Sequence, residues 1–129
     1  MANIANIVVW CLLIDRGKKC MALPFRVWVP LDAIVNDLKK EVKKDNSDLN
    51  EVAIRNLVVW RCKEPKLFIW EKEEWLVEHI KGINFKNKAA AVELPVTVQV
   101  ASLGLQPEEV LVVQLSSAGS VGELQQIRY

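Results

Sequence analysis

IVVWCLLI, residues 7–14, is the longest unbroken apolar run of the chain and is rich in β-branched and aromatic residues. The polar stretch DRGKK follows it at residues 15–19 and contains a glycine. This pattern predicts a strand that ends in a hairpin turn. Since the run does not alternate between apolar and polar residues, we expect the strand to be buried on both faces, as a central strand of a sheet is. The run is too short to cross a membrane, which takes about 20 residues.

The residues after the turn alternate as those of a half-exposed strand do. FRVWV at residues 25–29 is apolar at every second position, and a proline stands on each side of it. The alternation predicts a second strand whose apolar side faces the core, which puts Trp28 on the outer face of the sheet, near Trp10 of the first strand. Large exposed apolar patches are rare on monomers. Trp10 and Trp28 are therefore predicted either to be covered by a later helix of the chain or to form a protein interface. That interface would be between two copies in a homodimer or with another protein partner.

From Leu31 the period of the sequence changes. Apolar residues recur at a spacing of three or four as far as Val42, and charged residues fill the positions between them. The pattern predicts an amphipathic helix with Asp32 as its N-cap. The lysines of this segment interleave with acidic residues, so we interpret them as a solvated face and not as a basic patch or a localisation signal.

Shorter elements follow along the chain. Their patterns predict a strand at residues 57–63, a helix at 70–83, a loop at 84–91 and a last strand at 110–115. Residues 116–129 contain glycine and serine and are expected to form a flexible C-terminal tail or linker.

Composition and element order together predict the fold class. The chain has 129 residues, 51% of them hydrophobic and 26% charged, which is typical of one ordinary globular domain. The order of strands and helices predicts an α+β fold of the β-grasp type, in which one amphipathic helix lies across a mixed sheet and the first and last strands pair in parallel. The net charge of +1 provides no strong field for a nucleic acid or an anionic membrane.

The sequence offers no arrangement of residues typical of catalysis. Its 3 cysteines form no CxxC pair, which argues against a disulfide framework and a zinc site. The single histidine, His79, lies on the apolar stripe of the second predicted helix, where we expect a partly buried imidazole with its hydrogen bonds made. Cys62 stands between Arg61 and Lys63, which would favour a thiolate, but we interpret it as a structural thiol. No enzymatic activity, cofactor or metal is predicted.

Two segments resemble those of ubiquitin-like domains. PLDAIVNDLKKEVKK at residues 30–44 is similar to the start of their main helix, and VASLGLQPEEVLVVQL at 100–115 is similar to their ending. The resemblance implies a ubiquitin-like domain over residues 1–115. It also implies an insertion at about residues 68–95, which would contain the second helix.

The chain further resembles the N-terminal ubiquitin-like domain of the Crinkler effectors of oomycetes and some fungi. Their third strand carries the motif LxLFLAK, which is matched here, with conservative replacements in the middle, by Leu57, Val59, Trp60 and Lys63. The motif's third Leu and its Ala are replaced by Arg61 and Cys62. The second family landmark, HVLVVVP, is matched at residues 110–113, whereas residues 109, 114 and 115 differ.

The Crinkler resemblance implies a non-catalytic module that mediates protein interactions and accompanies secretion and translocation into host cells. It also implies a C-terminal effector domain in the full-length protein, active in the host cell and often in its nucleus. No signal peptide is visible, which in this family indicates an unconventional secretion route. The alternative is an intracellular regulatory or homo-oligomerisation domain fused to an NTPase or a nuclease.

Overall fold

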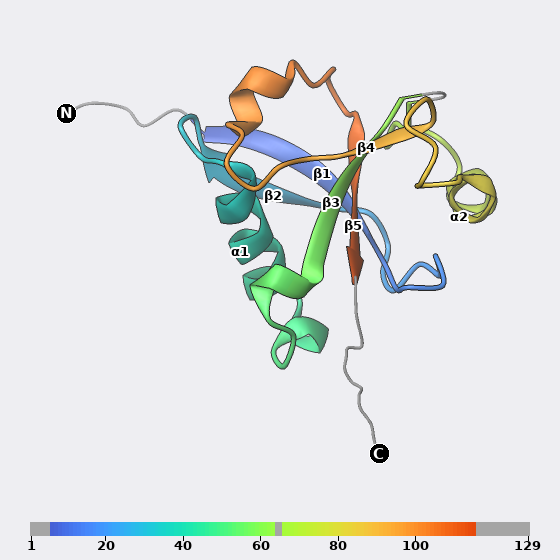
Figure 1. The fold of residues 1–129 in the computed structure, drawn as a ribbon, viewed down its shortest axis with the longest axis horizontal. Helices are drawn as coiled ribbons and strands as arrows, with labels where there is room; N and C mark the ends of the chain where they lie inside the picture. Colours follow the sequence, from blue (N-terminus) through green and yellow to red (C-terminus); the bar gives the residue numbers. More distant parts are fainter. Residues whose placement is uncertain (1–5, 64–65, 116–129) are drawn as a thin grey trace.

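In the computed structural model, residues 6–63 and 66–115 are described. They form one five-stranded sheet in the order β2-β1-β5-β3-β4 with a helix on each side (Figure 1). The strands are β1 (Asn6–Ile14), β2 (Phe25–Pro30), β3 (Leu57–Cys62), β4 (Ala91–Glu93) and β5 (Val110–Leu115). The helices are α1 (Val35–Asp45) and α2 (Glu73–Gly82), and short 3-10 turns occur at Ser47–Leu49, Ile54–Asn56 and Val100–Leu103.

The strand directions are those of a ubiquitin-like β-grasp. β1 and β5 pair in parallel at the centre of the sheet, with Trp10 opposite Val110. β2 pairs with β1, and β3 pairs with β5, each in the antiparallel direction. The predicted fold class is therefore confirmed, including the central place of the long apolar first strand.

One face of the sheet packs against α1. Alternate residues of the strands point to this side and are fully buried, among them Val9, Val27 and Val113. From α1, Leu38 and Val42 lie on the same core. The alternation predicted for β2 is confirmed, because Val27 and Val29 are buried whereas Arg26 and Trp28 are exposed.

The main helix begins later than the sequence predicted. It starts at Val35, and Leu31 is 53% exposed in a turn in which the Ala33 amide donates to the Pro30 carbonyl. The predicted cap at Asp32 is wrong. Instead, the carboxylate of Asp37 accepts a hydrogen bond from the amide of Ile34 at 3.1 Å. The turn after Pro30 takes up the first residues of the periodic stretch, and the helix starts only when this turn is complete.

The second face of the sheet has its own core beneath α2. Leu12 and Ile14 of β1, and Val110 and Val112 of β5, are buried there with Leu76 and Ile80 of α2, as a second apolar cluster. Aromatic side chains line its border, including Trp60 and Phe85, whose ring centroids are 5.0 Å apart. The helix predicted at residues 70–83 is thus a layer of the fold, and Figure 1 shows it on the far side of the sheet from α1.

The stretch assigned to an insertion, residues 68–95, also contributes to the main sheet. β4 lies within it and pairs with β3, with Cys62 opposite Ala91. After β4, the carbonyls of Val96 and Val98 accept hydrogen bonds from the first amides of α1, those of Asn36 and Val35. Before Ala91, Phe68 forms an isolated bridge to Glu109, whereas α2 lies outside the sheet. The predicted tail at 116–129 lies outside the described residues. Within the described residues, no helix is long and apolar enough to span a membrane.

Candidate protein-interaction surface

The outer face of β1 and β2, opposite to α1, carries a group of side chains that we call the outer patch: Val8, Trp10, Arg26 and Trp28. In the strand register Val8 lies opposite Trp28, and Trp10 lies opposite Arg26. Trp28 is 55% exposed and Val8 is 39% exposed, while Trp10 is half-buried. The predicted outward position of Trp28 is confirmed.

Arg26 lies between the two tryptophans of the outer patch. Its Cζ is 5.8 Å from the ring centroid of Trp10 and 6.0 Å from that of Trp28. Both separations are within the range of a cation–π interaction, which orients the guanidinium along the sheet surface. Arg26 is exposed and makes no ion pair within the described residues. The outer patch therefore combines apolar area with one positive charge that has no carboxylate partner there.

The core beneath α2 reaches the outer patch only at Trp10, which packs against it, and leaves Val8 and Trp28 uncovered. It buries Leu12 and Ile14 in the second half of β1, where β1 pairs with β5. In the first half of β1, Val8 remains exposed, as does Trp28 beside it. The second helix therefore does not cover Trp28, which was one of the two predicted alternatives. That Trp10 and Trp28 form a protein interface stays a prediction.

The four motif residues on β3 and just after it have different surroundings. Leu57 and Val59 are fully buried in the core beneath α1. Trp60 points to the other side, where its Nε1 donates to Oε1 of Gln114 on β5 at 3.0 Å. Lys63 is exposed, and its Nζ donates to the carbonyl of Lys88 at 3.0 Å. Of the four, Lys63 is the exposed residue. Leu57, Val59 and the hydrogen-bonded Trp60 contribute mainly to the fold.

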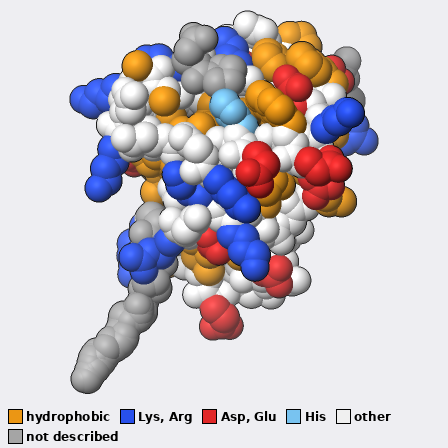
Figure 2. Space-filling model, turned by 90° about the vertical axis from the view of Figure 1, so that its right-hand side faces the viewer, with side chains coloured by type: hydrophobic (Ala, Val, Ile, Leu, Met, Phe, Trp, Pro, Cys, Tyr) orange, Lys and Arg blue, Asp and Glu red, His pale blue; other side chains and the backbone are white. Residues whose placement is uncertain are grey.

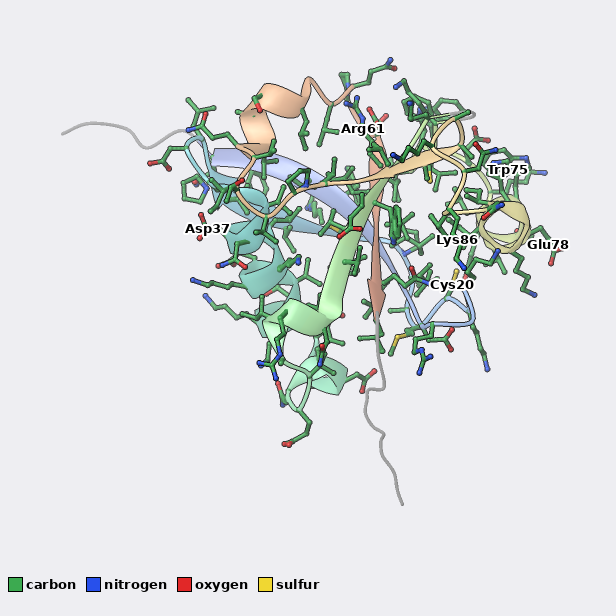
Figure 3. All side chains as sticks on the ribbon, in the orientation of Figure 1. Cys20, Asp37, Arg61, Trp75, Glu78 and Lys86 are labelled. Carbon is green, nitrogen blue, oxygen red and sulfur yellow. The ribbon has the colours of Figure 1, made fainter. Side chains whose placement is uncertain are left out.

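A buried ion pair, which no pattern along the sequence predicted, connects β3 to the residue before β5. Arg61 Nε donates to Oε2 of Glu109 at 2.8 Å, and Arg61 also donates to the carbonyl of Leu103 at 2.7 Å. Figure 3 labels Arg61 on the ribbon. The side chain of Glu109 is 1% exposed. Burial alone would raise the pKa of Glu109, but hydrogen bonds from Arg61 and the Gln106 amide, with the charges of Arg61 and Lys66, hold that pKa below its ordinary value.

Arg61 and Glu109 are both positions where the sequence departs from the Crinkler landmarks. Gln114, another departure in the second landmark, accepts a hydrogen bond from Trp60, a conservative replacement in the first. Because β3 and β5 are neighbours, departures in one landmark lie against departures in the other. A basic replacement in one motif and an acidic replacement in the other, on strands predicted to be neighbours, would have been the sequence signal for this ion pair.

The thiols are not set up for nucleophilic chemistry. Burial raises the pKa of Cys11 and of Cys62 to about 12, and the charge of Glu109 adds to the shift of Cys62. Cys20 is half-buried, and its pKa is also raised, first by burial and then by the charge of Glu73. No group of three or more metal-ligating side chains occurs in the described part of the chain.

His79 belongs to the surface of the α2 layer. Its ring stacks on that of Trp75 at a centroid distance of 4.7 Å, and it is half-buried as expected. The expected hydrogen bonds are not complete, because the buried Nε2 has no partner within the described residues. Figure 2 shows the face that carries this histidine, with both basic and acidic side chains spread over it, so this face has no dominant charge.

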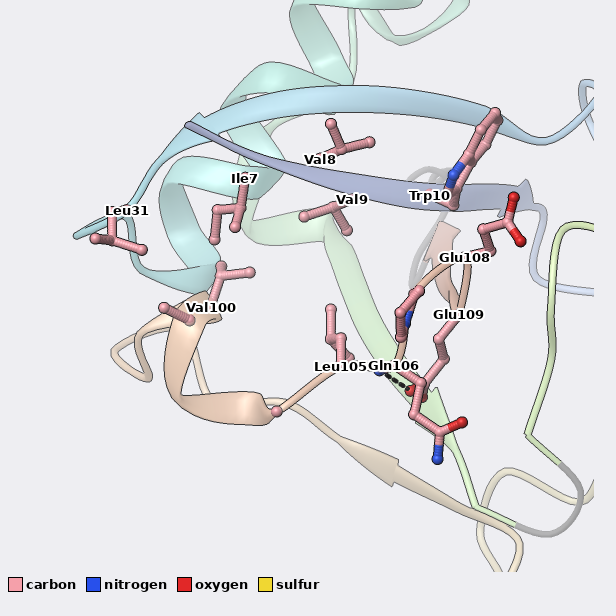
Figure 4. Close-up of a pocket in the computed structure, with 13 residues that line it drawn as sticks. Ile7, Val8, Val9, Trp10, Leu31, Val100, Leu105, Gln106, Glu108 and Glu109 are labelled. Carbon is pink, nitrogen blue, oxygen red and sulfur yellow. Dashed lines mark hydrogen bonds between the residues drawn. The ribbon is translucent and has the colours of Figure 1, made fainter. Parts of the chain in front are cut away.

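An apolar cavity of about 350 Å³ adjoins the outer patch (Figure 4). It lies where the first half of β1 is separated from residues 100–109, since β1 pairs with β5 only from Trp10 onward. Ile7, Val100 and Leu105 line one end, and Glu108 stands at the other end beside Trp10. The cavity holds no combination of acid, base and nucleophile suited to catalysis.

Comparisons with known proteins show a likeness in fold. No family model matches the chain, and no curated protein matches its sequence. Among solved structures, the chain is similar to the C-terminal ubiquitin-like domain of mouse tubulin-specific chaperone e, with a TM-score of 0.48 and 11% identity. The match covers 89% of this chain and 93% of that domain. The ubiquitin-like fold of the present chain rests on its own strand order and strand directions.

Proposed function

We propose that this chain is the N-terminal domain of a Crinkler-type effector, a non-catalytic module that mediates protein interactions during secretion and translocation into host cells. The observation that supports the proposal is the relation between the two family landmarks. The LxLFLAK-like stretch forms β3 and the residue after it, the stretch 110–113 lies in β5, and the two strands are antiparallel neighbours. Where both depart from the family pattern, Arg61 pairs with Glu109. Two changes that offset each other in one sheet are what a diverged member of a family would carry.

In this proposal the activity of the full-length protein resides in a C-terminal effector domain, which acts in the host cell or its nucleus. The N-terminal domain itself contacts proteins. Burial raises the pKa of the Cys11 and Cys62 thiols to about 12, which is unfavourable for nucleophilic catalysis. The outer patch supplies the contact area, because Trp28 and Val8 are exposed next to the charge of Arg26.

The test of the motif uses Lys63, because it is the exposed motif residue. Substitution of the buried Leu57 or Val59 would unfold the domain and abolish delivery for a trivial reason. In the full-length protein, we expect Lys63→Ala to leave stability within about 0.5 kcal/mol and to reduce delivery into host cells. Lys40→Ala, at an exposed lysine of α1, is the matched control. Equal delivery by the wild type and both variants would contradict a role for the motif in translocation.

The second candidate is an intracellular regulatory or homo-oligomerisation domain fused to an NTPase or a nuclease. The free edge of β2 favours it, because an open strand edge is a template for association with another chain. Deleting residues 1–115 separates the two functions. Loss of a delivery domain leaves the C-terminal activity intact and removes uptake, whereas loss of a regulatory domain changes the activity itself.

A further inference from the structure

β2 is an edge strand whose outer side has free peptide groups. In the sheet order it is hydrogen-bonded to β1 alone. The Met21 amide donates to the Leu13 carbonyl, so Leu13 and every second residue before it direct their peptide groups toward β2. Their partners in β2 are Phe25, Val27 and Val29. Because peptide groups alternate along a strand, those of Arg26 and Trp28 point away from β1, to the open edge.

The side chains on this edge only partly protect it against pairing with another chain. Prolines at 24 and 30 bracket it, and Arg26 is charged, features that limit pairing to a short segment. Between them, Trp28 is 55% exposed. A tryptophan left exposed at an edge is an anchor for association, since aromatic residues are enriched at the centres of protein interfaces.

Complementary charges flank Trp28. Arg26 precedes it by two residues and makes no ion pair within residues 6–63 and 66–115. Asp32 follows it, in the turn that the Ala33 amide closes onto the Pro30 carbonyl. Asp32 is exposed, and its carboxylate likewise has no hydrogen bond or ion pair in the described part of the chain. One edge thus carries a cation and an anion, neither with an ion-pair partner among those residues, on opposite sides of an exposed tryptophan.

We propose that a second copy of this chain docks on this edge, β2 against β2 in the antiparallel direction, with the twofold axis at Trp28. In this register the two copies of Trp28 lie opposite each other and exchange both backbone hydrogen bonds. Arg26 of each copy lies opposite Pro30 of the other, beside the turn that carries Asp32. The two Arg26–Asp32 pairs and the two tryptophans are then self-complementary, as a twofold interface must be.

The dimer shares Trp28 and Arg26 with the outer patch but does not require the delivery function, and a measurement on the purified chain tests it separately from delivery. Sedimentation equilibrium of the chain is expected to show a monomer–dimer equilibrium, and Trp28→Ser is expected to weaken it at least tenfold. Trp70→Ser is the matched control, because Trp70 is 64% exposed but lies outside the sheet. Circular dichroism confirms that each variant is folded.

Charge reversal tests the register. Arg26→Asp and Asp32→Arg should each weaken the dimer at least tenfold, because each places like charges together across the axis. The double variant should restore association to within a few fold of the wild type. A wild type that stays monomeric at all concentrations would overturn the proposal. Equal weakening by Trp28→Ser and Trp70→Ser, or a double variant as weak as either single one, would also overturn it.

Discussion

Arg61 Nε lies 2.8 Å from Oε2 of Glu109, and this ion pair joins β3 to the residue immediately before β5. The same guanidinium donates to the carbonyl of Leu103, so one side chain holds the segment that leads into the central strand. The Glu109 side chain is nearly sealed from water at 1% exposure, whereas that of Arg61 is 18% exposed. Such a pair is costly to break, because the remaining charge stays buried without a counter-charge.

Arg61→Leu should therefore lower the free energy of unfolding by about 3 kcal/mol, because it leaves the Glu109 carboxylate buried and unpaired. The measurement is urea denaturation followed by tryptophan fluorescence. The double variant Arg61→Leu with Glu109→Gln removes both charges and should recover part of the loss. If the single variant were as stable as the wild type, the ion pair would have no structural role.

The ion pair also predicts the acid sensitivity of the domain. The folded-state pKa of Glu109 is lowered, so the stabilisation is fully present above the unfolded pKa of about 4.3. It is lost as the pH falls from there through the folded pKa. Denaturation curves between pH 6 and pH 3 should show a smaller acid-induced loss of stability for Glu109→Gln than for the wild type. The same slope in both proteins would contradict the lowered pKa.

Ile80 tests whether α2 is an integral layer of the fold. Its side chain is fully buried against the second face of the sheet. Ile80→Ala should lower the free energy of unfolding by about 2–5 kcal/mol, as large-to-small changes in a packed core do. Glu78→Ala, at an exposed site of the same helix, should change it by less than about 0.5 kcal/mol. A small effect of Ile80→Ala would mean that α2 is only loosely attached.

Alkylation tests the prediction that the chain is not a cysteine-dependent enzyme. Cys11 and Cys62 are buried with a pKa of about 12, whereas Cys20 is half-buried. At pH 8, iodoacetamide should modify only Cys20 in the folded protein, and all 3 thiols in urea. Mass spectrometry gives the count, and Cys20→Ser should show no labelling when folded. Rapid native labelling of Cys62 would revive the interpretation of a reactive thiolate.

The hydrophobic pattern was sufficient to predict the main strands of the sheet. The apolar run at 7–14 and the alternation at 25–29 both form strands as predicted. The first strand is buried on both faces only from Cys11 onward, however, because Val8 is exposed in its first half. The start of α1 was not predictable in this way, because Leu31 fits the helical period but lies in the turn after Pro30. β4 is only 3 residues long and has no periodic signal of its own.

The sequence predicted only those features of the candidate site that depend on the pattern of a single strand. The alternation around Trp28 was enough to place that residue on the outer face. The contact of Arg26 with two tryptophans depends on the register of β1 against β2, and the ion pair of Arg61 depends on β3 lying next to β5. A pattern along one segment does not contain such relations between segments.

Delivery of the full-length protein into host cells tests the central proposal most directly. The uptake of the tagged wild type should be compared with that of a variant in which residues 1–115 are replaced by an unrelated folded domain of similar size. The proposed delivery function predicts that the replacement abolishes uptake while the activity of the C-terminal domain, measured on the purified protein, is unchanged. Uptake at the wild-type level after the replacement would contradict it.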